Sequence, residues 1–345
     1  MAKGGTFPDG KSSRVSLKSL AADLGLSPST VSFVLNDTPG RSIPEATRER
    51  VRRAAAEHNY QPSMIARTLQ GKRMQTIGIL LPELGEGYHS QVLSGIGDLL
   101  MERDYFYFTV HHRHKPDLVR MYPDLLQARG VDGILAIDTT LHAPLPLPAV
   151  LVAGHTELRD VTNVVLDHEH AARLSLEHLY GLGHRRIVFM KGQAVSTDTQ
   201  LRWEATLRIA RELGLSVQDD LLVELAIDST SPEVSYPAIR DLIERRANFT
   251  AIVCFNDVSA MGSIRALHDL GKRVPQDVSI LGFDDIQSSA FQVPSLSTIR
   301  QPLRAMGAAA AEALLRKLAH EEVARVICMK PELVVRESTS APARS

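Results

Sequence analysis

The sequence has few cysteines, few aromatic residues and no long apolar run, and each shortage excludes a class of protein. Its 345 residues include two cysteines, Cys254 and Cys328, too few and too far apart for a disulfide framework or a cysteine metal site. We expect both to be buried free thiols in a reducing compartment. No apolar run reaches the ~18 residues that span a bilayer, and the first fifteen residues lack the apolar core of a secretory signal. These absences predict a cytoplasmic protein with no membrane partner.

Motifs for common enzyme chemistry are also missing. The chain has neither the Gly-x-Ser-x-Gly of serine hydrolases nor the Gly-x-x-x-x-Gly-Lys-Ser/Thr of phosphate-binding loops. His111, His112 and His114 lie close together in sequence, but no cysteine or carboxylate at a suitable spacing accompanies them. We interpret these histidines as a solvated strand end rather than a metal site. The sequence therefore predicts a protein that is not an enzyme and holds no cofactor or metal.

The apolar residues that are present favour a particular kind of core. Hydrophobic residues make up 44% of the chain but aromatic residues only 5%. The core must therefore consist mainly of Leu, Val, Ile and Ala, which suits helices packed on parallel strands. A chain of this length is long enough for two or three domains.

The net charge of −1 conceals an uneven distribution. Residues 1–75 carry twelve Lys and Arg against six Asp and Glu, a net +6, and the remainder carries twenty-seven against thirty-four, a net −7. A basic N-terminal segment on an acidic body indicates that this segment binds a polyanion.

Three short helices are predicted in the basic segment. Ser16 can cap a helix over residues 17–24, which ends at Gly25. Ser27 can cap a second helix that begins at Pro28, where a missing N–H has no cost. A third amphipathic helix is expected over 44–58. Two short helices joined by a glycine-containing turn predict a helix-turn-helix domain over residues 14–60, preceded by a disordered arm over 1–13.

The next segment, residues 61–75, predicts a short hinge helix that begins after Pro62 and ends at Gly71. A helix of this length is not stable alone in water. It either folds only on DNA, with Leu69 wedged into a minor-groove step and Arg67 near the backbone, or it is a flexible linker. Spacing alone does not separate these alternatives.

Strands and helices alternate along the rest of the chain. A buried strand at 76–82 is followed by a series that reaches a strand at 148–152, and a second series starts near Val164 and reaches a strand at 279–283. Such alternation predicts parallel sheets with right-handed crossovers. Two series predict two lobes, with ligands bound beyond the carboxyl ends of the strands.

Several motifs together resemble the lactose/galactose-repressor (LacI/GalR) family. They include Ser27-Pro-Ser-Thr-Val-Ser-Phe-Val-Leu-Asn36, Ala66-Arg-x-Leu69, Phe255-Asn-Asp257 and Gly271-Lys-Arg-Val-Pro275 through Asp285. The likeness extends from Val15 to Ser338. It implies an α/β fold with an N-terminal three-helix helix-turn-helix head and hinge helix, then a two-lobed body of parallel sheets like the periplasmic binding proteins. Lobe 1 is expected at about 76–164 and 300–330, and lobe 2 at about 165–299 and 331–340, within a body over 76–345.

The resemblance also implies sites for two partners, operator DNA and a small effector. The expected DNA contacts are Ser16, Leu17, Ser27, Pro28, Ser29, Thr30, Ser32, Phe33, Asn36, Tyr60, Ala66, Arg67 and Leu69. Phe33 stands where other members of the family have Arg or His. A phenyl ring cannot hydrogen-bond to guanine, but it can pack on a thymine methyl group. The expected effector contacts are Tyr88, His89, Arg202, Asn256, Asp284 and Gln301.

Each effector residue also has a purely structural interpretation. Arg202 could form a surface salt bridge, Asn256 and Asp284 could cap a helix or turn, and an aromatic residue such as Tyr88 could simply pack on its own lobe. Gln301, near the chain crossing, is the weakest candidate. Ala153 stands where many members have a ligand-binding aspartate, so no known sugar specificity can be transferred.

The sequence thus predicts a homodimeric repressor that binds double-stranded, pseudo-palindromic operator DNA and responds to a small effector, a sugar first and a nucleobase second. Two rival functions share the two-lobed fold. A solute-binding protein for transport is disfavoured by the basic head, and a sugar-converting enzyme is disfavoured by the lack of a nucleophile or paired carboxylates.

Overall fold

The computed structural model describes residues 15–35, 38, 40–58, 60, 73–85, 87–155, 157–226 and 231–343. The chain divides into two compact units, Met1–Met74 and Gln75–Ser345. The predicted arm at 1–13 lies outside the described residues, as does nearly all of the predicted hinge helix, including Ala66, Arg67 and Leu69. Those expectations stay predictions.

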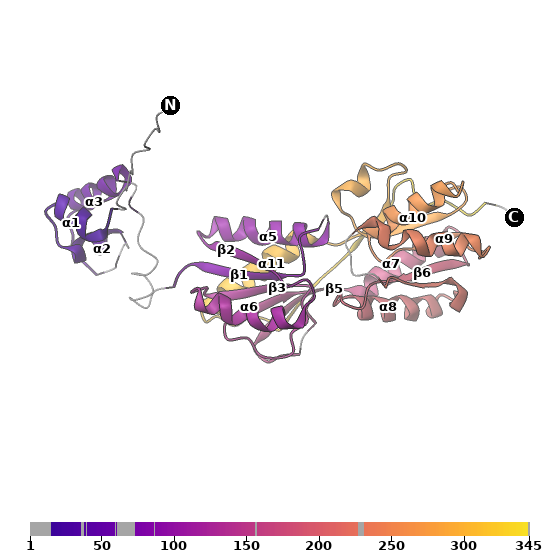
Figure 1. Ribbon diagram of the computed structural model, residues 1–345, viewed down its shortest axis with the longest axis horizontal. Coiled ribbons are helices and arrows are strands. Elements are labelled where there is room, and N and C mark those ends of the chain that lie inside the picture. Colours follow the sequence, from indigo (N-terminus) through magenta and orange to yellow (C-terminus); the bar gives the residue numbers. More distant parts are fainter. Residues whose placement is uncertain are drawn as a thin grey trace, which may run out of the picture. The chain divides into compact units, whose positions relative to one another are not determined.

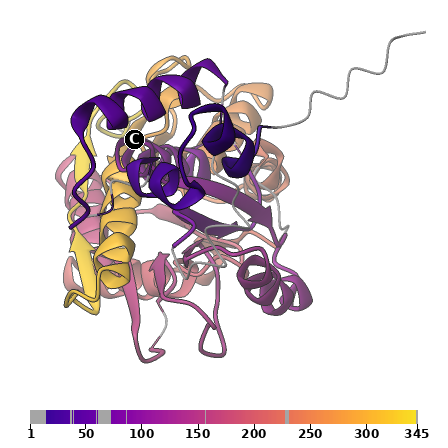
Figure 2. The same ribbon diagram turned by 90° about the vertical axis from the view of Figure 1, so that its left-hand side faces the viewer.

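In its described residues, the N-terminal unit contains three helices, α1 (Leu17–Asp23), α2 (Pro28–Leu35) and α3 (Glu45–Glu57). Their start signals are the serines that the sequence offers. Ser16 accepts a hydrogen bond from the backbone N–H of Ser19 (3.1 Å), and Ser27 accepts one from Thr30 (3.1 Å). The helices close around a small core of Leu20, Ala21, Val31, Val34, Val51 and Ala55 (Figure 2). Local capping and one apolar face per helix are enough to specify these three helices. The described part of this unit therefore follows the sequence prediction closely.

The second unit contains two six-stranded sheets (Figure 1). The sheet of lobe 1 has the order β11-β5-β4-β3-β1-β2, and all its pairs are parallel. The sheet of lobe 2 has the order β12-β10-β9-β8-β6-β7, with β12 antiparallel to β10. Within the described residues, the strands are β1 (Thr76–Leu81), β2 (Phe106–His111), β3 (Gly133–Ile137), β4 (Ala149–Val152), β5 (Val161–Leu166), β6 (Ile187–Lys191), β7 (Leu222–Glu224), β8 (Ala251–Val253), β9 (Ser279–Asp284), β10 (Ser297–Arg300), β11 (Val326–Met329) and β12 (Glu332–Val334).

Helices cover both faces of each sheet, as parallel strands require. In lobe 1, α5 (Tyr88–Glu102) and α11 (Leu303–Leu318) pack on the face formed by Ile77, Ile79 and Leu135, and α6 (Pro116–Ala128) packs on the face formed by Leu80 and Ile134. Successive residues of one strand therefore belong to different cores, which is why β1 and β3 are buried throughout.

Lobe 2 repeats this arrangement. The helices α7 (His168–Gly181) and α8 (Thr199–Glu212) cover one face, and α9 (Tyr236–Glu244) and α10 (Asp257–Asp269) cover the other. Short 3₁₀ turns occur at Asp219–Leu221, Pro232–Val234 and Gln287–Ala290.

The chain crosses between the lobes three times, after β5, after β10 and after β11. The sequence prediction located a second strand-helix series near Val164, but the strand at that position, β5, completes the sheet of lobe 1. It also named neither α11 nor β11, and it expected only parallel pairing. Local periodicity reveals a strand but not the sheet to which it belongs, so these long-range pairings had no signal in the sequence.

Two predictions about side-chain exposure are wrong. Cys254 is buried but Cys328 is exposed, because it lies on β11 at the edge of its sheet with one face uncovered. His112 is not at a solvated strand end: its side chain is buried, and its Nε2 lies 2.9 Å from Thr139 Oγ1.

The described part of the chain contains no helix that is both long and apolar enough to cross a membrane.

Two glycines allow α5 and α11 to approach each other closely. A Cβ added at Gly307 would lie 2.1 Å from the carbonyl oxygen of Val92, and one added at Gly95 would lie 1.9 Å from that of Arg304. Both obstacles are backbone atoms, which cannot rotate away. The contact that fixes α11 on lobe 1 therefore depends on the absence of these two methyl groups.

We expect Gly307→Ala to lower the free energy of unfolding by about 1–3 kcal/mol, because the helices must separate to admit the methyl group. Denaturant unfolding of the purified protein measures this difference. Gly181→Ala is the control, since no atom lies within 4 Å of its added Cβ, and it should change stability by less than about 1 kcal/mol. Equal stability of the wild type and Gly307→Ala would contradict the close packing.

Candidate functional site

The outer surface of the N-terminal unit presents most of the residues predicted to contact DNA. Ser16, Ser27, Pro28 and Ser29 are exposed at the starts of α1 and α2, and Thr30, Ser32 and Phe33 are half-buried along α2. Leu17 and Tyr60 are half-buried against the helical core, so both also stabilise the unit itself. Asn36 lies outside the described residues.

A cation faces the ring of Phe33. The guanidinium carbon of Arg41, in the segment between α2 and α3, lies 4.6 Å from the ring centroid. This distance is within the range of a cation–π contact. Arg41 therefore places a positive charge beside Phe33, where the sequence alone indicated only an apolar ring.

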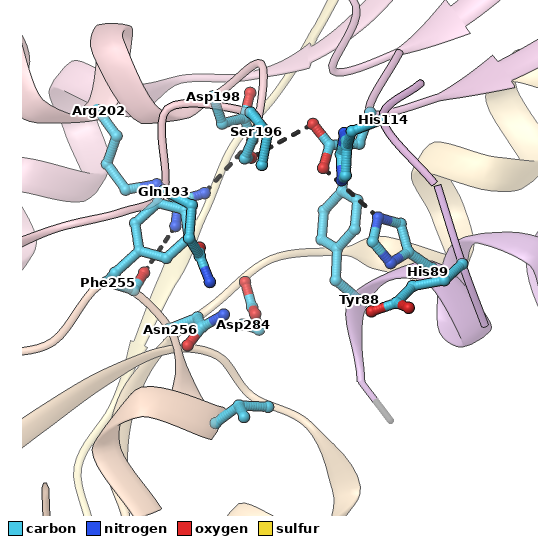
Figure 3. A pocket seen from close by; sticks show the side chains of 14 residues that line it. Tyr88, His89, His114, Gln193, Ser196, Asp198, Arg202, Phe255, Asn256 and Asp284 are labelled. Carbon is cyan, nitrogen blue, oxygen red and sulfur yellow. Dashed lines mark hydrogen bonds and ion pairs between the residues drawn. The ribbon is translucent and has the colours of Figure 1, made fainter. Parts of the chain in front are cut away.

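The second unit contains a pocket between its two lobes. It has about 760 Å³ of space not filled by atoms, part of it open to solvent. Of the six predicted effector residues, five line it: Tyr88, His89, Arg202, Asn256 and Asp284 (Figure 3). Gln301 does not line the pocket but donates a hydrogen bond to Asp284 (2.6 Å), so it holds the carboxylate from behind.

Arg202 extends from the first turn of α8 into this pocket. Its guanidinium carbon lies 3.8 Å from the centroid of the Phe283 ring, and its Nη1 donates to the carbonyl oxygen of Phe255 (2.7 Å). Its Nη2 contacts Asp198 Oδ2 at 3.3 Å. The side chain is buried, and its Nε has no hydrogen-bond partner. A surface salt bridge, the structural alternative for Arg202, is therefore wrong.

Asp284 is the last residue of β9 and has a left-handed backbone, with φ of 118°. Burial raises the pKa of its carboxyl to about 8, and the nearby carboxylate of Asp257 acts in the same direction. Arg202 opposes this rise but does not cancel it. Asp284 therefore carries a proton at neutral pH and can donate as well as accept a hydrogen bond.

Asn256 has both of the roles that the sequence left open. It caps α10, where its Oδ1 accepts from the N–H of Ser259 (2.8 Å), and its side chain also lines the pocket.

Tyr88 and His89 begin α5 on the opposite wall. The hydroxyl of Tyr88 is buried without a hydrogen-bond partner, and burial raises its pKa well above the usual value. His89 Nε2 lies 3.5 Å from Asp138 Oδ2.

The sequence did not reveal the residues that join the lobes. Asp138, which follows β3 in lobe 1, accepts hydrogen bonds from the backbone and hydroxyl of Thr197 in lobe 2, both at 2.7 Å. The hydroxyl oxygen of Thr197 also contacts the carbonyl oxygen of Ala153 in lobe 1. Asp138 could have been found from its place at the carboxyl end of a strand, but the loop at 192–198 carries no pattern.

Asp198 completes this junction. Its Oδ1 lies 2.5 Å from Nε2 of His155, which follows β4 in lobe 1, and its Oδ2 contacts Arg202 in lobe 2. The nearby histidines and Arg202 hold the pKa of Asp198 well below its usual range, against the opposing effect of burial. The pKa of Asp138 is lowered as well, by His89 and Thr197, so both carboxylates are ionised.

Comparisons with known proteins agree with this architecture. Residues 16–63 match the model of the bacterial regulatory proteins of the lacI family, and residues 176–339 match that of a periplasmic binding protein-like domain. The HTH-type transcriptional repressor PurR of Haemophilus influenzae is 30% identical over 338 residues, which cover 94% of this chain and 98% of that protein.

Solved structures show the same likeness in three dimensions. The lac repressor dimer bound to operator and the anti-inducer ONPF superimposes with a TM-score of 0.84 at 26% identity, covering 95% of this chain and 99% of that chain. The complex of the transcriptional regulator CelR with cellobiose gives a TM-score of 0.70 at 25% identity, covering 94% and 100%. The relatives are transcriptional repressors rather than enzymes, in agreement with the sequence prediction.

We expect Asp284→Asn to change how stability depends on pH. The pKa of Asp284 is about 8 in the folded protein and near the ordinary value of ~4 in the unfolded chain. Between these two pH values the Asp284 carboxyl stays protonated in the folded protein but loses its proton in the unfolded chain. The contribution of Asp284 to the free energy of unfolding therefore falls progressively as pH rises from about 4 to about 8. The asparagine variant has no such loss.

Thermal melts at pH 5, 6, 7 and 8 measure the effect. The melting temperature of Asp284→Asn should rise relative to that of the wild type as pH increases. A constant offset for Asp284→Asn would show that its carboxyl titrates normally.

Proposed function

We propose, since the chain belongs to the lacI family of bacterial regulatory proteins, that this DNA-binding transcriptional repressor is switched by a neutral, hydroxyl-rich effector held between its lobes. In this proposal residues 14–60 bind operator DNA, residues 61–75 form the hinge, and residues 76–345 bind the effector and dimerise. The single observation that carries the effector assignment is the interlobe pocket, with five predicted contact residues on its walls.

The charges in the pocket favour a neutral ligand that donates hydrogen bonds. Asp138 and Asp198 are ionised acceptors at the junction of the lobes, and Arg202 is already engaged by Asp198 and Phe255. An anionic ligand would meet two carboxylates, whereas hydroxyl groups could donate to them. A sugar has this chemistry, and the similar regulator CelR is described as a cellobiose complex.

A nucleobase is the second candidate. Tyr88 and Phe255 both line the pocket, and a planar heterocycle can stack on an aromatic ring. Its ring nitrogens and carbonyls would need the mixed donors and acceptors that Asn256 and Asp284 supply.

An exposed apolar surface supports the proposed homodimer. Met101 on α5, Phe106 and Phe108 on β2, and Met121 and Leu125 on α6 are all exposed. They lie on lobe 1 around β2, the edge strand of its sheet. Exposed apolar residues beside the edge strand of a sheet are typical of a surface that a second protein covers. We propose a second copy of this chain, because two heads on one pseudo-palindrome require two chains.

A thermal-shift screen of sugars, glycosides and nucleobases tests the pocket. A specific ligand at a hundredfold excess over its dissociation constant stabilises the protein by about 2.7 kcal/mol. We expect Arg202→Ala to abolish this shift and the ligand's effect on DNA binding, while DNA affinity without ligand is kept. Arg208→Ala, on the exposed side of the same helix, is the matched control and should respond like the wild type. A full response in Arg202→Ala would exclude this arginine from the site.

The proposed hinge makes a separate prediction about DNA. Leu69→Ala should weaken binding to the specific operator by about 1–3 kcal/mol, the scale of one lost base-pair contact, because the wedge that opens a minor-groove step is removed. Non-specific binding depends on phosphate contacts, so it should keep its affinity and salt dependence. Titrations with operator and random duplexes at two salt concentrations distinguish these cases, and an equal loss on both duplexes would refute the wedge.

A further inference from the structure

Three side chains from distant parts of the sequence converge beside the pocket. They are His155, His168 and Asp198, and one ligand atom from each lies within 4.8 Å of the others. Oδ1 of Asp198 lies 2.5 Å from Nε2 of His155 and 3.1 Å from Nε2 of His168. In the part of the chain that the structure describes, this is the one group of three or more His, Cys, Asp or Glu side chains close enough to share a metal ion.

His168 is the member of this group whose ring nitrogens make no hydrogen bond. Its side chain is only 7% exposed, and neither ring nitrogen has a hydrogen-bond partner. Its Nε2 lies close to Asp198 but outside hydrogen-bond geometry. A buried imidazole without partners is costly, and one aimed at a carboxylate and a second imidazole is positioned as a metal ligand.

The histidines at 111, 112 and 114 provide a useful contrast. Both ring nitrogens of His112 are occupied, because Nε2 is bonded to Thr139 and Nδ1 accepts from the backbone N–H of His114. The ring nitrogens of His112 are thus used by local hydrogen bonds, whereas His168 has an Nε2 contact to Asp198 at 3.1 Å and no hydrogen bond within the described residues.

One oxygen of Asp198 is left to the two imidazoles. The side chain is buried, Arg202 contacts its Oδ2, and its Oδ1 faces His155 and His168. A buried carboxylate oxygen beside two imidazole nitrogens provides ligand atoms of the kind that a transition-metal ion binds.

We propose that His155, His168 and Asp198 bind one divalent transition-metal ion of the zinc class. Two imidazole nitrogens and one carboxylate oxygen are ligands that zinc accepts, and three protein ligands leave a fourth position open. The open position can hold a water molecule or a polar group of a ligand in the pocket, since Asp198 also lines that pocket.

The placement of the ligands gives the metal a mechanical effect. His155 follows β4 of lobe 1, whereas His168 begins α7 and Asp198 directly precedes α8, both in lobe 2. An ion bound to all three therefore links the lobes directly and stabilises the arrangement seen here. The metal site does not depend on the identity of the effector, so it can fail or hold independently of the proposed function.

Zinc and cobalt titrations of the full-length chain test the proposal. The protein is prepared without a polyhistidine tag, stripped with a chelator and transferred to chelator-free buffer. Zinc affinity is measured by competition with a chromophoric chelator, and cobalt absorption reports the ligand type. We expect one equivalent to bind, with a cobalt spectrum that lacks thiolate-to-metal bands, which excludes Cys254 and Cys328 as ligands.

Three single variants locate the site. His155→Gln and His168→Gln, one in each lobe, should each weaken zinc binding by at least about tenfold, the smallest loss usual for residues that only support a metal ligand. His170→Gln changes an exposed histidine on the same helix as His168 and should bind zinc like the wild type. Melts in chelator verify that each variant is folded. No zinc binding by the wild type, or zinc binding by both site variants as tight as that of the wild type, would overturn the proposal.

Discussion

The contact between Asp198 and the opposite lobe is the interaction on which the interlobe site depends. Its carboxylate meets His155 of lobe 1 through one oxygen and Arg202 of lobe 2 through the other, and the neighbouring Thr197 binds Asp138 of lobe 1. These polar contacts are buried, so their strength changes sharply with any charge or ligand placed beside them. A molecule that enters the pocket must therefore favour or oppose this particular arrangement of the lobes.

Several residues around the site have an unfavourable backbone conformation. Asp138, Ala153, His155 and Asp284 all have positive φ values, and all lie at or just beyond the carboxyl ends of strands. Left-handed backbone costs free energy at residues other than glycine, and it persists where surrounding contacts hold it in place. Here those contacts are hydrogen bonds between the lobes and from Gln301 to Asp284. The strained positions and the buried charges coincide, as expected where a fold is built around a ligand rather than around its own core.

The sequence predicted most of the elements but few of the contacts that make the site. Capping serines and apolar faces determine α1 to α3, and strand-helix alternation identified nearly every strand from β1 to β9. The membership of β5 in lobe 1 depends on pairing across the whole unit, which no local pattern encodes. The family resemblance supplied Arg202 and Asp284. In contrast, His155, His168 and Asp198 are separated by 13 to 43 positions in the sequence, and they meet only because the chain crosses between the lobes after β5. Spacing rules for metal sites therefore missed them.

The central claim is that the interlobe pocket and the DNA-binding head are energetically coupled. By thermodynamic linkage, a ligand that changes DNA affinity by some factor must have its own affinity changed by DNA by the same factor. The most direct measurement is the dissociation constant of a pocket ligand determined by calorimetry with and without saturating operator duplex. If the pocket and the head are coupled, we expect the two dissociation constants to differ by a factor of about 5 to 150, the usual range of allosteric coupling. Identical dissociation constants would mean that the pocket and the head act independently, and would contradict the coupling.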